Sequence, residues 1–411
     1  MVIKLDRICV WIFIVCLALM STTDYLGYLD ELASFLLACV AFADFIFNRK
    51  NRSRYVPLLV VIFILFCYVL YSIAIGSNGI KYILLDFVIQ IKSFLAFLVV
   101  YAIAPIMNSS EKKIISVISV INIVAVAILL LIGEPYIEMS IGHIANGGII
   151  IFLNILIFMF CNLNEDNSLF APQKIIVVIS LLAGLMCTRS KYYGECIFLL
   201  FMLFLYKPGM MRSFKFKHLI LVLLLFSVIG FAVWNKFSYY FIGSSMGESF
   251  DSDFIESMAR PALYYASGEI LIDYIPFGSG LASFATYASY ANYSDIYFQY
   301  GLNNVWGLSP EMPDFICDAF YAELAQFGIV GIILFIYFWY WAYGKIKPLI
   351  QDESLKYVFI VGASAFFFIL VECTTGTAFI RSSGVIVMMI LGFVTAIAKE
   401  HKMSTIKNKN I

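Results

Sequence analysis

Apolar runs long enough to cross a lipid bilayer recur along most of this chain. A helix needs about 20 apolar residues to cross the hydrocarbon core. Polar breaks separate twelve candidate runs: 8–22, 31–47, 56–75, 82–104, 114–132, 146–161, 174–188, 190–206, 218–234, 318–343, 356–373 and 383–398. Only 13% of the residues are charged, whereas a soluble domain has about 25%. The sequence therefore predicts an all-α integral membrane protein with about twelve transmembrane helices.

The basic residues predict the orientation of these helices. With the N-terminus in the cytoplasm, twenty Lys and Arg residues fall on the cytoplasmic side and six on the outer side, while Lys92 lies within a run. Cytoplasmic loops of membrane proteins carry such an excess of Lys and Arg. We therefore expect both termini to be cytoplasmic.

This topology divides the chain into four parts. Residues 1–234 hold the first nine transmembrane helices, 235–317 form one large outer loop, 318–398 hold the last three helices, and 399–411 form a cytoplasmic tail. No repeat relates the two halves of the chain, as it would in many transporters.

Cations are scarce in the outer loop. Between residues 236 and 323, eleven acidic residues face only Lys236 and Arg260. Arg260 precedes Pro261, which predicts a helix beginning at that proline. Free N–H groups at such a start favour an anion, and the guanidinium fork suits phosphate oxygens. The alternative is an ion pair of Arg260 with Glu256 or Asp253.

A second group of charges lies in the outer turn CTRSKYYGE, residues 187–195, between two apolar runs. Lys191 and Glu195 are four residues apart on the following helix and can form a structural pair. That leaves Arg189 without an obvious local partner, so it is a second candidate for binding an anion.

Three motifs follow one another in this order: TRSKYYGE (188–195), RPALYYASGEILIDYIPFGSGLASF (260–284) and CDAFYAELAQFGIVGIILF (317–335). Together with the large outer loop, they resemble the family of O-antigen polymerases and O-antigen ligases. These are membrane glycosyltransferases that act on undecaprenyl-linked sugars.

The resemblance implies an enzyme of the GT-C type in the bacterial inner membrane, with its active site facing the periplasm. The donor would be an oligosaccharide linked to undecaprenyl diphosphate, without a nucleotide sugar, metal or other cofactor. Arg189 and Arg260 match the arginines that bind the diphosphate in the family. Membrane lipid and a chain-length-determinant protein would be further partners, and nucleic acid would not.

The resemblance also suggests which family reaction the chain performs. Ligases of the family carry a histidine before the tenth span, where this chain has Asp318, and none of its three histidines lies in the outer loop. This favours a polymerase, with Asp318 as the candidate base and Asp314 and Glu323 as alternatives. A ligase that transfers glycan to the lipid A core remains the nearest alternative, and a flippase or transporter of lipid-linked oligosaccharides is the more distant one.

Further residues complete the candidate substrate site. Lys191, Asp314 and Arg381 are expected on the outer face, and Arg381 could instead form a brace with Glu372. The stretch PFGSG, 276–280, predicts a turn, or else Gly278 and Gly280 could present backbone N–H groups to the diphosphate.

Other signals are weaker. The DSD at 251–253 resembles a metal-binding motif, but such short matches are common, and the nine cysteines form no zinc spacing. We therefore expect no metal. Asp86 and Lys92, inside a predicted span, could line an access route for lipid. Five tyrosines recur at helical spacing, which predicts a packing or membrane-surface face, or alternatively a glycan groove: Tyr287, Tyr290, Tyr293, Tyr297 and Tyr300.

Overall fold

The computed structural model describes residues 4–22, 27–164, 167–208 and 258–409, together with the single positions 227 and 230. Every regular element in these ranges is an α-helix or a 3-10 helix, which confirms the all-helical prediction. The predicted span 218–234 lies outside the described residues except for those two positions. Lys236, the DSD segment and Glu256 lie outside them as well.

The first half of the chain forms a series of helices joined by short turns. They are α1 (Leu5–Ala18), α2 (Leu29–Phe47), α3 (Val56–Ile75), α4 (Ile80–Ile103), α5 (Ser109–Ile132), α6 (Glu134–Ile141), α7 (Ile144–Cys161), α8 (Ala171–Gly184) and α9 (Ser190–Phe204). The second half adds α12 (Ala259–Asp273), α13 (Tyr287–Ala291), α14 (Asp295–Gln299), α15 (Phe320–Glu323), α16 (Gly328–Ile346), α17 (Lys356–Glu372) and α18 (Ser382–Lys409).

Seven helical stretches in the described ranges are long and apolar enough to cross a membrane: Asn51–Ile75, Ile80–Ile103, Ser109–Ile132, Ile144–Cys161, Phe320–Ile350, Glu353–Glu372 and Ser382–His401. The other described candidates are helical but fall short. α1, α8 and α9 have 14, 14 and 15 residues, and α2 carries Asp30, Glu31 and Asp44. The chain is thus a helical membrane protein, and seven of the twelve predicted runs form helices, among the described residues, that are long and apolar enough to span a bilayer.

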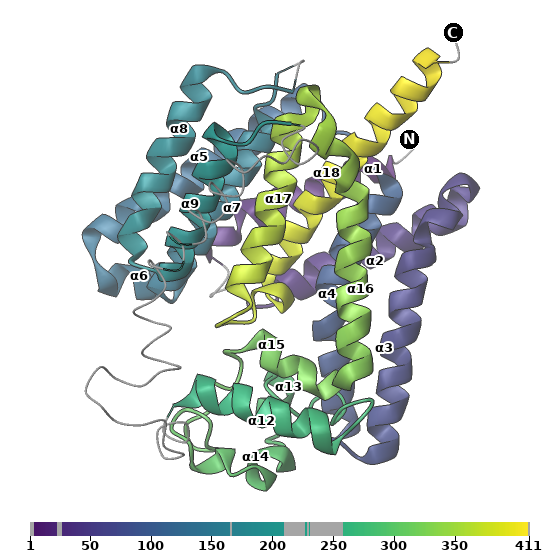
Figure 1. Cartoon of the computed structure of the whole chain (residues 1–411), viewed down its shortest axis with the longest axis vertical. Helices are drawn as coiled ribbons and strands as arrows, with labels where there is room; N and C mark the ends of the chain where they lie inside the picture. The colour runs from purple at the N-terminus through teal and green to yellow at the C-terminus, as the bar shows by residue number, and fades with distance from the viewer. Residues whose placement is uncertain are drawn as a thin grey trace.

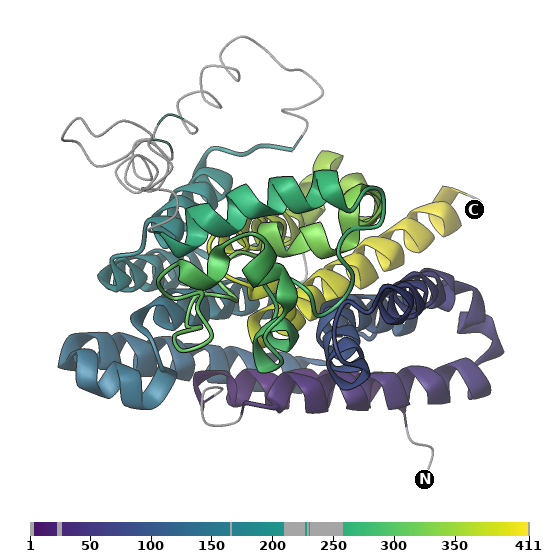
Figure 2. The same cartoon turned by 90° about the horizontal axis from the view of Figure 1, so that it is seen from below.

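The helices form a bundle with a smaller layer at one end (Figure 1). Both termini lie at the opposite end of the bundle (Figure 1). Residues 258–319, which include α12, α13 and α14, make up this smaller layer, which we call the distal layer. Figure 2 shows it covering the end of the bundle, while α3 and α16 extend toward it in Figure 1.

The distal layer has an apolar core of its own, which includes Leu263, Ile270 and Tyr297. Tyr297 is fully buried, and its hydroxyl accepts a hydrogen bond from the Ala285 N–H at 2.8 Å. The five tyrosines do not share one helical face, because the chain breaks between α13 and α14, where Ser294 caps the start of α14. The prediction of a continuous tyrosine stripe is therefore wrong.

Two charged residues inside the bundle, Lys92 and Asp86, connect different parts of the fold. The Lys92 ammonium of α4 donates to Asp30 and, at 2.6 Å, to Glu31, both on α2. Asp86 accepts from the Ala282 N–H at 2.7 Å, which ties α4 to the distal layer. Both side chains are buried, so they brace elements of the fold and do not line an access route for lipid.

Candidate functional site

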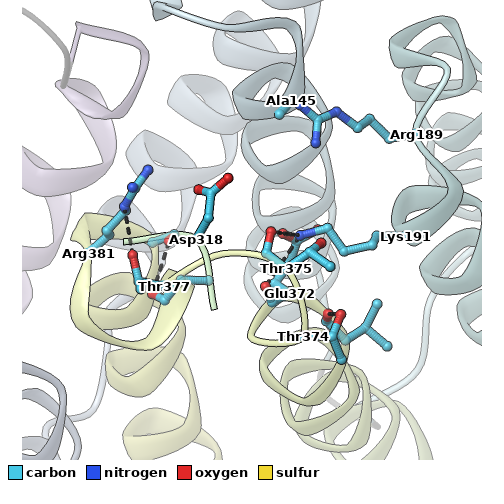
Figure 3. Close-up of polar contacts among 12 residues, drawn as sticks. Ala145, Arg189, Lys191, Asp318, Glu372, Thr374, Thr375, Thr377 and Arg381 are labelled. Carbon is cyan, nitrogen blue, oxygen red and sulfur yellow. Dashed lines mark hydrogen bonds and ion pairs between the residues drawn. The ribbon is translucent and has the colours of Figure 1, made fainter. Parts of the chain in front are cut away.

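A polar cavity of about 310 Å³ lies between the bundle and the distal layer. Its wall contains six of the nine candidate site residues that the sequence singled out: Arg189, Lys191, Arg260, Asp314, Asp318 and Arg381. These residues come from four separate segments of the chain, and Figure 3 shows several of them pointing toward a common space. The fold therefore gathers the cations of the turn before α9, of α12 and of the segment before α18 into one site.

Arg260 lies in the first turn of α12, which begins at Ala259, two residues earlier than predicted. Its Nη2 donates to Asp318 Oδ2 at 2.6 Å, and the two side chains are 26% and 21% exposed. The guanidinium also lies 5.8 Å from the centre of the Phe315 ring. Arg260 is thus held against the segment that carries Asp318, whereas the partners considered from the sequence, Glu256 and Asp253, lie outside the described residues.

Arg189 occupies the N-cap position of α9, directly after Thr188 in a left-handed conformation. Its Nη2 lies 2.8 Å from His143 Nδ1. Since a guanidinium has no acceptor, the imidazole nitrogen must accept this bond. The same nitrogen accepts from the Ala145 N–H at 3.1 Å and caps α7. Figure 3 shows the guanidinium beside the start of α7.

Burial and neighbouring charges shift the pKa of the Arg189 guanidinium. Burial lowers the pKa of its guanidinium, the Glu372 carboxylate raises it, and Arg260 lowers it again. An arginine remains charged at neutral pH in spite of such shifts. Arg189 and Arg260 line the same cavity, so an anion bound there would be attracted by both charges.

Lys191 does not pair with Glu195, the partner expected from their spacing. Its Nζ donates to Glu372 Oε2 at 2.6 Å and to the carbonyl oxygens of Glu372 and Thr375, each at 3.3 Å. An ammonium group has three hydrogens, so these three acceptors use all of them. Lys191 therefore braces α9 against α17, and we no longer expect it to donate to a substrate.

Arg381 does not brace Glu372, because Lys191 takes that carboxylate. Its Nε donates to Thr377 Oγ1 at 3.0 Å. Arg189 and Arg381 thus donate to neutral groups, while Arg260 and Lys191 each donate to a carboxylate. The cavity accordingly keeps positive charge that suits a polyanion such as a diphosphate.

Gly278 and Gly280 are predicted site residues that the structure places outside the cavity wall. They have φ values of +80° and +87°, and the Gly280 N–H donates to the Gln326 carbonyl at 2.9 Å. The backbone of Gly278 lies so close to that of Gly328 that a Cβ atom would overlap it. These glycines form the turn that fastens the distal layer to α16.

Two of the three candidate bases lie in the cavity wall and the third does not. Glu323 is buried in α15, where it accepts from Gln90 Nε2, outside the cavity wall. Asp314 and Asp318 both line the cavity. Asp318 remains the leading candidate because it lies directly beside Arg260.

The cavity wall includes residues that sequence reasoning missed, among them His143 and Phe315. His143 precedes an apolar run by a few residues, and its position on the predicted outer side was the only local signal. Among the described residues, no group of three or more His, Cys, Asp or Glu could hold a metal ion. The DSD segment lies outside those residues.

No protein-family model matches the chain, and no curated protein is significantly similar to it in sequence.

Proposed function

We propose that this protein is a polysaccharide polymerase that uses lipid-linked sugars on the periplasmic face of a bacterial inner membrane. It would transfer a glycan from undecaprenyl diphosphate to the sugar end of another undecaprenyl-diphosphate-linked repeat unit. The observation that carries the proposal is the polar cavity, in which the cations of the first two motifs and Arg381 meet beside Asp318 of the third motif.

The arginines would bind the donor diphosphate. Arg189 and Arg381 donate to neutral groups that a phosphate oxygen can replace without separating an ion pair. As the bond between the sugar and the diphosphate breaks, its electron pair moves to the leaving oxygen. Positioned donors that meet this developing charge contribute about 10²–10³-fold each to the rate.

Asp318 would accept the proton of the attacking sugar hydroxyl. The hydroxyl oxygen forms the new bond to the anomeric carbon, its proton passes to the carboxylate, and the diphosphate leaves. Arg260 donates to the Asp318 carboxylate at 2.6 Å, so the guanidinium that would meet the departing phosphate oxygens lies beside the group that would take the proton.

An apolar groove of about 760 Å³ supports a lipid-linked substrate. It runs along α16 and α17, and its wall includes Tyr321 and Leu370. These residues lie three positions after Asp318 and two before Glu372, which both line the polar cavity. A polyprenyl tail in this groove would have its diphosphate at the cavity.

A ligase is the second candidate because of His143. The sequence argument against a ligase was the lack of a histidine in the outer loop, yet His143 lines the cavity. Its Nδ1 already accepts two hydrogen bonds, which leaves that nitrogen without capacity to act as a base. The polymerase reading is therefore preferred.

Surface glycans from a deletion strain test the proposal. The strain is complemented with wild type, Arg189→Ala, Arg260→Ala or Asp318→Ala at matched membrane levels. Arg52→Ala is the control, since Arg52 donates to backbone carbonyls of α2. We expect single repeats on the lipid core with the deletion and the three site variants, and full polymer with the control.

Two other outcomes would overturn the proposal. Long polymer retained on undecaprenyl diphosphate would show a ligase. Single repeats retained on the inner face of the membrane would show a flippase.

A further inference from the structure

An exposed tryptophan packs beside Phe315, a residue in the wall of the polar cavity. Trp306 is 62% exposed, although it belongs to an ordered turn of the distal layer. Its ring centre lies 5.2 Å from that of Phe315, with 49° between the ring planes. Phe315 lines the cavity, so the two rings form an aromatic pair that joins the cavity wall to an exposed part of the distal layer.

The backbone holds this aromatic pair in place. Gly307 has a φ of +81°, and a Cβ atom there would overlap the Phe315 ring. The Phe315 N–H donates to the Gly307 carbonyl at 2.9 Å, and the Tyr293 hydroxyl donates to the Leu308 carbonyl at 2.7 Å. The two residues that follow Trp306 are thus both held by hydrogen bonds to other parts of the distal layer.

The same segment carries the candidate base. The Asp318 N–H donates to the Phe315 carbonyl at 3.2 Å, so both residues belong to one turn. Asp314, next to Phe315, also lines the cavity, and the Arg260 guanidinium lies near the Phe315 ring. A ligand stacked on the rings would have one edge near the carboxylates.

We propose that Trp306 and Phe315 bind the sugar ring of the acceptor glycan and direct its hydroxyl toward Asp318. A pyranose has an apolar face of C–H groups that packs on an aromatic ring, while its hydroxyls point outward from the ring edge to polar groups. Aromatic side chains provide such a contact surface at a small cost in side-chain entropy. This inference rests on the proposed glycosyl transfer and adds the subsite of the acceptor.

The test separates acceptor from donor by using a soluble acceptor. Lipid-linked repeats are extracted from cells that lack the protein, and free repeat oligosaccharide is released from part of them by mild acid. Purified protein in lipid nanodiscs then transfers sugar from the lipid-linked repeat to the free oligosaccharide. The KM for the oligosaccharide is compared among wild type, Trp306→Ala, Trp306→Phe and Phe298→Ala.

Phe298 is the matched control. It belongs to the distal layer, is 54% exposed, and has its ring centre 5.4 Å from that of Tyr293. We expect Trp306→Ala to raise the acceptor KM about tenfold, which corresponds to the upper range of an aromatic contact. The KM for the lipid-linked donor should stay within twofold, Trp306→Phe should recover most of the affinity, and Phe298→Ala should match wild type.

Equal acceptor KM values for Trp306→Ala and Phe298→Ala would overturn the inference while the transfer itself stands. An equal rise in KM for the donor and for the acceptor would also overturn the inference, and it would indicate that the tryptophan anchors the protein in the membrane. If wild type transfers no sugar, the proposed function fails. In that case, binding of the free oligosaccharide, followed as quenching of tryptophan fluorescence, still tests the subsite. Quenching in wild type but not in Trp306→Phe supports the subsite. Equal quenching in the two proteins refutes it.

Discussion

Removing one partner of the Lys191–Glu372 pair should destabilise the protein strongly. The two side chains are 15% and 8% exposed, and their charged atoms lie 2.6 Å apart. Loss of one partner of a buried pair typically costs about 3–5 kcal/mol, because the other charge stays buried without compensation. Water in the adjoining cavity can hydrate part of that charge, so we expect Lys191→Met to cost about 3 kcal/mol, at the low end of this range.

The double variant Lys191→Met/Glu372→Met leaves no unpaired charge. We therefore expect its cost to fall below the sum of the two single costs by about 2 kcal/mol. The assay is equilibrium unfolding in mixed micelles with increasing SDS, applied to wild type, both single variants and the double variant. Asp6→Asn serves as the control, because its contact with Arg7 is 3.7 Å long and the side chains are 38% and 34% exposed. We expect this variant to lower the free energy of unfolding by less than about 0.5 kcal/mol.

Purely additive single costs would refute the assignment of Lys191 as a brace. The same assignment also predicts the activity of the double variant. Since all three hydrogens of the ammonium are engaged within the protein, the double variant should retain polymerisation within about tenfold when it is folded. A complete loss of activity in a folded double variant would instead restore Lys191 as a ligand of the substrate.

Three other predictions concern the site and its support. Arg260→Ala should lower kcat/KM, measured in nanodiscs, about 10²–10³-fold. Arg260→Lys should recover only a small part of the lost activity, because lysine lacks the guanidinium fork. A fully active Arg260→Lys would contradict this role. Gly278→Ala should reduce the yield of folded protein, because its Cβ would overlap the Gly328 backbone. Gly268→Ala is the control, since a Cβ there meets open space on α12, and it should leave stability unchanged or raise it. Solubility and thermal-shift measurements compare the two variants. His143→Asn keeps a side chain that can cap α7 and accept from an arginine, so it should be more active than His143→Ala; equal activities would exclude a positioning role for the imidazole.

The positions of most helices could be predicted from the sequence, because the thickness of a bilayer sets a minimum length for each apolar run. The runs 56–75 and 82–104 correspond to Val56–Ile75 and Ile80–Ile103. Helix ends were less predictable. α12 begins before Pro261 because Met258, two residues before Arg260, adopts the extended N-cap conformation, which the proline signal alone does not reveal.

The gathering of charged residues in one cavity could also be predicted, but the partners of those residues could not. Spacing along the sequence suggested Lys191 with Glu195, whereas the observed partner is 181 residues away. Local spacing describes one helix surface and contains no information about which helix packs beside it. His143 escaped prediction for the same reason, since only the packing of α7 beside the start of α9 brings it to Arg189.

The central claim is that the polar cavity breaks a sugar–diphosphate bond and forms a glycosidic bond in the same reaction. The most direct measurement reconstitutes the purified protein in nanodiscs with radiolabelled lipid-linked repeats, and counts undecaprenyl diphosphate released against new sugar linkages formed. We predict one molecule of the diphosphate for each linkage, and loss of both products in Arg189→Ala and Arg260→Ala. Release without linkage, or linkages that persist in both arginine variants, would contradict the account.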